Sequence, residues 1–211
     1  MAGGTAGAVR AAGIKAAGIV ACQVLEVMKK RVRPGITTAE LDKIGKQVMR
    51  QNGAHSTSAM VYCFPGGSCI SVNDEAVHGI PGDRTIQEGD LVKLDVTIEK
   101  NGFMADTAAT VAAGAISNER QRLIRCVERA FAKAMLVVKA GFRVFEIGRV
   151  IEREVHRHGF SVVRDLCGHG IGRTIHEEPQ VPNYFDLRAS SVLTEGLVIT
   201  VEPIVAAGTG H

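Results

Sequence analysis

The sequence has few cysteines and little excess charge, which sets the first limits on its class. The five cysteines form no C-x-x-C pair, and their odd number fits a reducing compartment better than a disulfide framework. Lys and Arg (25) exceed Asp and Glu (22) by only three, and like charges form no long block. Nucleic-acid binding is therefore weakly supported. We predict a cytoplasmic protein with no specific nucleic-acid partner.

A long uninterrupted apolar segment is also absent. Residues 1–20 are rich in Ala and Gly, but Arg10 and Lys15 interrupt them, so we expect neither a signal peptide nor a membrane span. Apolar residues at helical spacing favour a core helix here, with an organelle transit peptide as the alternative. The 211 residues are 45% hydrophobic and include no low-complexity tract. They predict a single domain over residues 1–211.

Half of the sequence resembles the other half. The segments VRPGITTAELDKIGKQVMRQNG and VKAGFRVFEIGRVIEREVHRHG match at an offset of 106 residues. Each has helical apolar spacing and a closing glycine, which predicts a helix with a defined end. Thr37 and Glu40 supply a capping box to the first helix, and Arg143 breaks that pattern in the second. The repeat therefore predicts two halves of similar structure.

Another helix is expected before each copy, over residues 8–31 and 118–139, and strands are expected after it. Glu88 is followed seven residues later by Asp95, and Glu195 is followed seven residues later by Glu202, at an offset of 107. The expected strands have period two or form short apolar runs: SCISV, LVKLDVTIE, FMADTAATVAA, SVVRDLCG and GLVITVEPIV.

The first half contains a hairpin whose counterpart we expect to be incomplete. Asn101-Gly102 suits a type I′ turn, after which a return strand carries Asp106. The equivalent position in the second half is 213, two residues beyond His211. We therefore expect the domain to be incomplete at its C-terminal end and its last strands to be missing. An open strand edge would favour dimerisation. The alternative is a domain that is naturally shorter.

Asp95 and Asp106 are the first candidates for chemistry. They lie eleven residues apart on two strands joined by a tight turn, which can bring both carboxylates to one end of a sheet. Two adjacent carboxylates repel, and divalent cations would neutralise them, as in two-metal sites. Acidic residues beside a hairpin are also commonly solvated, so this reading stays open.

Further candidates lie around His169, which two glycines flank, and around His176, seven residues later. Glu202 lies in an apolar strand, where a carboxylate needs either a metal or a salt-bridge partner. His78 lies between a strand and a turn. Oxygen and imidazole ligands without a thiolate suit Mn, Fe, Co or Zn. A surface location explains His156 and His158 on the second repeat helix.

Together these motifs identify a family. The segments S-V-N-x-x-x-x-H-G-I-P, Asp-x10-Asp, G-H-G-I-G followed by H-E-E-P, and I-T-V-E-P resemble type I methionine aminopeptidases, in the same order and along nearly the whole chain. The resemblance implies the pita-bread fold, an α/β (α+β) arrangement in which a helix pair and antiparallel strands repeat about a pseudo-twofold axis around a curved central sheet. This fold agrees with the internal repeat.

The resemblance also implies an activity. A metal-activated water would remove the initiator methionine from nascent proteins and peptides with a small second residue. Asp95, Asp106, His169 and Glu202 would be ligands of divalent metal ions, with Asp106 bridging two ions. Glu202 would also shuttle a proton, and His78 and His176 would act on the substrate side. The expected partner is the N-terminus of a peptide or a nascent protein, which the ribosome could present.

The resemblance implies a methionine pocket formed by Phe64, Cys69 and Ile175. Ile175 replaces an aromatic residue common in the family, and Val77 replaces a Cys, so the pocket differs in detail. The family carries a further bridging glutamate on the strand expected to be missing, so one metal ion instead of two is expected here. The alternatives are an inactive fragment, a non-catalytic peptide-binding module, and prolidase-like cleavage before proline.

Overall fold

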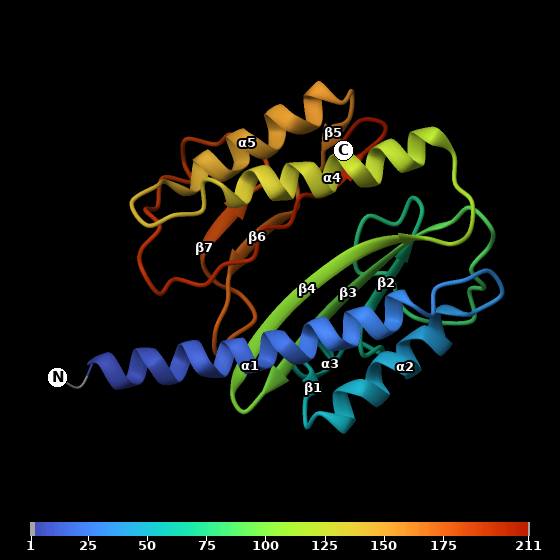
Figure 1. Ribbon diagram of the computed structural model, residues 1–211, viewed down its shortest axis with the longest axis horizontal. Coiled ribbons are helices and arrows are strands. Elements are labelled where there is room, and N and C mark those ends of the chain that lie inside the picture. Colours follow the sequence, from blue (N-terminus) through green and yellow to red (C-terminus); the bar gives the residue numbers. More distant parts are fainter. Residues whose placement is uncertain (1–2, 211) are drawn as a thin grey trace. The chain divides into compact units, whose positions relative to one another are not determined.

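The computed structural model describes residues 3–210, and this part of the chain divides into two compact units. Unit 1 comprises the chain up to Ser117 together with the short segment Gly172–Ile175. Unit 2 comprises Asn118–Ile171 and the chain from His176 onward. Most of the helices and strands are labelled in Figure 1, and each unit is described by itself below.

Unit 1 consists of an antiparallel sheet and the helices that cover one of its faces. The long strand β3 pairs with β4 along its whole length, while the shorter strands β1 and β2 share its other edge. Helix α1 packs on β3, β4 and α2. The elements are α1 (Gly3–Lys29), α2 (Thr38–Gln51), β1 (His55–Ser56), α3 (Thr57–Tyr62), β2 (Cys69–Val72), β3 (Leu91–Lys100) and β4 (Phe103–Ala112).

The alternation of residues along β3 separates an apolar face from a polar one. Side chains at even positions are fully buried in the core of unit 1, whereas odd positions carry polar groups. The predicted hairpin is confirmed: Asn101 (φ 53°) and Gly102 (φ 77°) both adopt the left-handed backbone of a type I′ turn. The buried set is Val92, Leu94, Val96 and Ile98, and the polar set is Lys93, Asp95 and Thr97.

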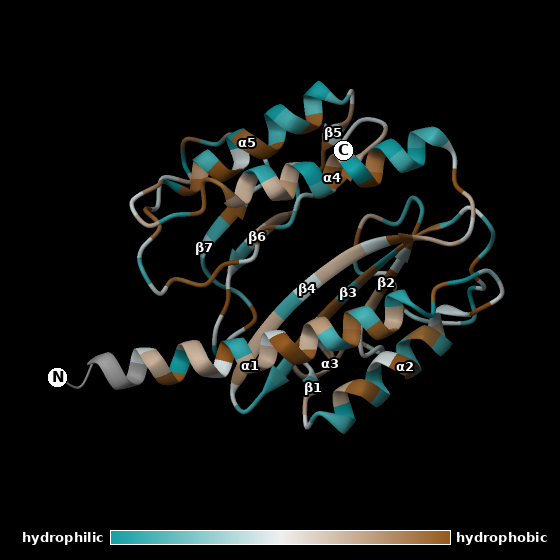
Figure 2. Cartoon of the chain, viewed as in Figure 1, coloured by the Kyte–Doolittle hydropathy of each residue, from teal (hydrophilic) through white to brown (hydrophobic). Residues whose placement is uncertain are grey.

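Helix α1 is more apolar than we expected. An 18-residue window within Gly7–Lys29 has a mean hydropathy of 1.5, so this helix could cross a membrane by length and composition. Figure 2 shows mainly pale to brown colours along this helix. However, 33% of the window is buried within the protein, and Val24 and Met28 belong to the hydrophobic core. The part of α1 that contains these residues therefore belongs to the core of unit 1.

Unit 2 also pairs two helices, but its strands are short. Helices α4 and α5 pack together, and α5 packs on β5 and β7. The core includes Cys126, Val144, Ile147, Ile151 and Val155, all fully buried. Strand β5 pairs with β8, and β6 pairs with β7. The elements are α4 (Asn118–Met135), α5 (Val144–Arg157), β5 (Ser161–Val162), β6 (Cys167–Gly170), β7 (Glu177–Pro182) and β8 (Val205–Ala206).

Equivalent contacts in the two units confirm the internal repeat. An isolated bridge joins Thr37 to Thr85 in unit 1, and another joins Arg143 to Val192 in unit 2. Thr37 forms both bonds of the predicted capping box with Glu40, while Arg143 at the start of α5 forms no side-chain cap. The helix pairs and their caps therefore follow the sequence pattern.

The prediction of a continuous strand from GLVITVEPIV was wrong. Around it, Ile199 forms one isolated bridge with Gly170, and the short strand β8 begins only at Val205. The neighbouring strand β6 is only four residues long, and Pro203 has no N–H to continue a ladder. The predicted strand SVVRDLCG likewise forms two separate short strands, β5 and β6.

Candidate functional site

In unit 1, Asp95 and Asp106 lie on the same face of the β3–β4 hairpin. Asp95 pairs with Ala108, and Asp106 pairs with Thr97. The two aspartates are therefore diagonal neighbours, a relation that places Cα atoms roughly 7–8 Å apart. We had expected them at one end of the sheet. They lie instead near the middle of the hairpin. A continuous ladder on β3 fixes this arrangement.

Cys69 and Lys93 share the surroundings of this pair. Cys69 lies directly across from Asp95 in the β2–β3 register. Burial, with a smaller contribution from the Asp95 and Asp106 carboxylates, raises the pKa of the Cys69 thiol to about 12. Burial lowers the pKa of Lys93, and the Asp95 carboxylate opposes that shift. Near Asp95, the polar face of this sheet thus carries the Asp106 carboxylate, the Cys69 thiol and the Lys93 amine.

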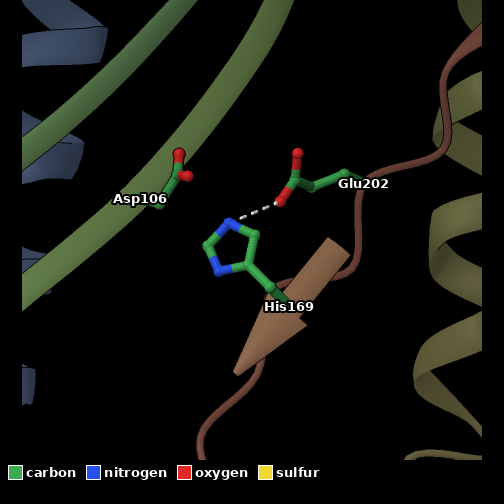
Figure 3. Close-up of side chains that lie close together, drawn as sticks. All are labelled: Asp106, His169 and Glu202. Atoms are coloured by element: carbon green, nitrogen blue, oxygen red, sulfur yellow. Dashed lines mark ion pairs between the residues drawn. The ribbon is translucent and has the colours of Figure 1, made fainter. Parts of the chain in front are cut away.

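In unit 2, His169 and Glu202 form the central pair. His169 lies on β6 and is 7% exposed. Its Nε2 lies 3.3 Å from Oε1 of Glu202, the contact dashed in Figure 3. On the other side of the ring, Nδ1 lies 2.9 Å from the Gly170 carbonyl oxygen. Because a carbonyl only accepts, this bond requires Nδ1 to carry a proton.

The protonation of Nδ1 defines what Nε2 can do. In a neutral imidazole, the unprotonated Nε2 is an acceptor. It then faces a carboxylate oxygen that is also an acceptor, so neither atom can donate to the other. That contact is favourable with an additional proton on Nε2 or with a cation that both atoms ligate. A metal-binding histidine typically donates its other N–H to a carbonyl or carboxylate. The His169–Glu202 pair therefore fits a divalent metal ion.

Thr200 connects His169 to Glu202 and was not among the residues predicted from the sequence. Its hydroxyl lies 2.5 Å from Oε1 of Glu202, and it accepts the backbone N–H of His169 at 2.9 Å. The sequence did contain a sign of this role. Thr200 lies two residues before Glu202, and residues with that spacing point to the same side of an extended chain. Its hydroxyl orients both members of the pair.

The two predicted substrate-side histidines fall in different units. His176 belongs to unit 2, where its ring meets the His169 ring edge to face with centroids 4.3 Å apart. His78 belongs to unit 1 and is exposed, with a left-handed backbone (φ 58°). The next residue, Gly79, bonds through its carbonyl to the Ile70 N–H at 2.9 Å, which ties this loop to β2.

The comparisons with known proteins decide the family. Residues 12–210 match the model of metallopeptidase family M24. The chain belongs to this family. It is 40% identical over 196 residues to a methionine aminopeptidase of Clostridium perfringens, covering 93% of this chain and 79% of that relative. The M24 family is metal-dependent, in agreement with the donor groups described above.

Solved structures assign the fold of this M24 chain. A methionine aminopeptidase from Thermotoga maritima superposes with a TM-score of 0.93 at 30% identity, covering 96% of this chain and 82% of that one. The mixed α/β arrangement is therefore the pita-bread fold, as the resemblance implied. A prolidase from Pyrococcus furiosus gives a TM-score of 0.79 at 24% identity, covering 92% of this chain and 55% of that one. That likeness extends to the fold alone.

The predicted pocket residues of the M24 chain all lie in unit 1. Cys69 and Ile175 are both buried, each 6% exposed, and Phe64 is half-buried. Ile175 is part of the segment Gly172–Ile175, which joins unit 1 although its neighbours in sequence belong to unit 2. The Met104 N–H donates to the Gly172 carbonyl at 2.8 Å, which fixes the start of this segment on β4.

Proposed function

We propose that this chain is a metal-dependent methionine aminopeptidase that removes the initiator methionine from nascent proteins and peptides with a small second residue. The observation that carries the proposal is the His169–Glu202 geometry, in which a protonated Nδ1 directs Nε2 toward a carboxylate. The M24 membership supports it, as does 40% identity to a methionine aminopeptidase over 93% of the chain.

The proposed ligands are Asp95, Asp106, His169 and Glu202. Asp106, His169 and Glu202 each offer one ligand atom, and Asp95 shares its sheet face with Asp106. Asp106, His169 and Glu202 would hold one ion, and Asp106 would also serve a second ion together with Asp95. Carboxylate and imidazole donors suit Mn, Fe, Co or Zn. We propose that residues 1–211 form one catalytic domain.

The side chains of this chain then have distinct tasks. When bound, a divalent ion supplies a nucleophile at neutral pH and polarises the peptide carbonyl. Glu202 accepts a proton from the attacking water and returns it to the leaving amine. His78 and His176 hold the substrate backbone by hydrogen bonds.

The methionine side chain would be bound by residues of unit 1. Phe64, Cys69 and Ile175 are apolar or weakly polar and are buried or half-buried, which suits an unbranched thioether. A pocket of small depth would restrict the second residue to short side chains. Cytoplasmic location, action beside the ribosome and dimerisation through an open strand edge stay predictions.

The test is methionine release from a Met-Ala-Ser peptide with added Mn(II), with Asp106→Ala as the control for contaminating peptidase. We expect turnover in the wild type and none in the variant. Equal rates in both proteins would remove the enzymatic proposal and favour a peptide-binding module. Cleavage of an Xaa-Pro peptide in preference to Met-Ala-Ser would instead favour the prolidase-like alternative.

A further inference from the structure

Thr200 forms an unusual pairing with His169 in unit 2. The Thr200 N–H donates to the His169 carbonyl at 2.7 Å, which is half of an antiparallel hydrogen-bonded pair. The reciprocal N–H of His169 donates to the Thr200 hydroxyl at 2.9 Å. The hydroxyl thus takes the position that a backbone carbonyl occupies in a regular ladder.

The hydroxyl proton determines the second bond. Because Oγ1 already accepts from the His169 N–H, its own proton is available to an acceptor. Glu202 Oε1 lies at 2.5 Å, much nearer than the His169 carbonyl at 3.3 Å. A hydroxyl donating to a carboxylate forms a strong, short bond. Thr200 therefore accepts from the residue that carries the imidazole and donates to the carboxylate beside it.

Burial makes the two hydrogen bonds of the Thr200 hydroxyl difficult to replace with bonds to water. Thr200 is 9% exposed and His169 is 7% exposed, so water has little access to either group. The Gly168 backbone also lies close to the Thr200 carbonyl, because a Cβ added at Gly168 would lie 2.4 Å from that oxygen. An apolar residue at position 200 would leave the His169 N–H and the Glu202 oxygen without this hydroxyl partner.

We infer that Thr200 is a positioning residue that fixes His169 and Glu202 relative to each other for metal binding. The inference rests on the proposed function, which assigns both residues as metal ligands. Groups that hydrogen-bond to ligands orient them and contribute to metal affinity. In this chain the same hydroxyl would orient an imidazole through its backbone and a carboxylate through its side chain.

The experiment compares Thr200→Val, which keeps the shape without the hydroxyl, with Thr200→Ser, which keeps the hydroxyl. Mn(II) is titrated into each metal-free protein by calorimetry at a temperature where all are folded. We expect Thr200→Val to weaken Mn(II) binding by about 10–100-fold, the usual effect of losing such a partner. Thr200→Ser should bind Mn(II) close to the wild-type affinity. Thr194→Val, at an exposed loop position, controls for hydroxyl loss in general.

Two results would overturn the inference while leaving the proposed function intact. One is wild-type Mn(II) affinity in Thr200→Val. The other is equal weakening in Thr200→Ser, which would show that the methyl group and not the hydroxyl matters. A wild-type protein that binds no Mn(II) would instead overturn the proposed function together with the inference. Thermal melting of the metal-free variants separates lost affinity from lost stability.

Discussion

The two units position their candidate ligands by different means. In unit 1, β3 is paired over ten residues with β4, and β2 adds a second ladder around Asp95. In unit 2, the corresponding stretch around Glu202 has an isolated bridge at Ile199 and a few further bonds. The same repeated framework thus holds Asp95 through a backbone ladder, whereas Glu202 depends on a side-chain bond from Thr200.

The donors also differ at equivalent positions. Lys93 lies two residues before Asp95, and Thr200 lies two residues before Glu202. In unit 1 a cation thus shares the sheet face with the aspartates, while in unit 2 a hydroxyl bonds directly to the glutamate. Equivalent positions of the repeat thus carry side chains of different chemistry, Lys93 in unit 1 and Thr200 in unit 2. Four pairs of substitutions and one pH dependence test how far the two units differ.

The largest expected effect comes from Asp106, the proposed bridging ligand from unit 1. Asp106→Asn removes the charge at nearly constant size. We expect kcat/KM to fall by roughly 1,000-fold or more, because the metal would no longer stabilise the transition state by several kcal/mol. Methionine release from Met-Ala-Ser measures it. Asp83→Asn, at an exposed position in the same unit, should keep the wild-type rate. Full activity in Asp106→Asn would exclude Asp106 as a metal ligand.

A bulkier residue beside Thr200 should weaken the sparse ladder of unit 2. In Gly168→Ala the new Cβ would lie 2.4 Å from the Thr200 carbonyl oxygen, so the backbone must move. Overpacking of this kind costs about 1–3 kcal/mol of unfolding free energy. Gly18→Ala in α1 meets nothing within 4 Å and should stabilise by about 0.5–1 kcal/mol. Urea unfolding measures both, and a neutral Gly168→Ala would contradict the close approach.

Each unit also contains a buried carboxylate paired with a lysine. Asp42 in unit 1 accepts two backbone N–H groups as well as Lys46, whereas Glu154 in unit 2 has its strongest contact with Lys133. We expect Lys133→Met to cost about 1–3 kcal/mol of unfolding free energy and Lys46→Met to cost less. Chemical denaturation of both variants tests this order, and equal losses would contradict it.

The Glu154 pair also predicts a pH dependence. The Lys133 hydrogen bond lowers the pKa of Glu154, while burial opposes this shift. A carboxyl whose folded pKa is depressed stabilises the fold above its unfolded pKa and loses that contribution as the pH falls through the folded value. The wild-type advantage over Lys133→Met should therefore be complete at pH 7 and shrink below about pH 4.3. An advantage that persists at pH 2 would contradict this.

The smallest effect concerns the helix caps. Thr37→Ala removes the capping box of α2 and should cost about 1 kcal/mol. Arg143 at the start of α5 forms no side-chain cap, and its bond to the Ser190 carbonyl is exposed. Arg143→Ala should therefore change stability by less than about 0.5 kcal/mol. Thermal melting of the two variants distinguishes them, and the opposite order would show that the caps do not explain the difference.

Local signals account for what could be predicted from the sequence. The capping box at Thr37, the Asn101-Gly102 turn and the period of β3 depend on neighbours in the sequence, and all three are confirmed. The shared face of Asp95 and Asp106 follows from period two once the turn is known. The candidate ligands were found because residue type and spacing carry their chemistry.

Features that depend on distant partners were missed. The run around Ile199 has a strand pattern, but its ladder depends on the length of β6 and on Pro203, so it forms only a bridge. Thr200 looks like an ordinary strand residue until His169 is known to lie beside it. The hydropathy of α1 was underestimated because two charges in its first half were given too much weight.

The segment Gly172–Ile175 has a consequence for how this protein could be divided. The chain passes from one unit to the other after Ser117, after Ile171 and after Ile175. A gene cut after Ser117 would deprive the Met104 N–H of the Gly172 carbonyl and the Phe103 ring of the Arg173 guanidinium, 4.5 Å from its centre. The halves repeat each other in sequence, yet no single cut separates the two units intact.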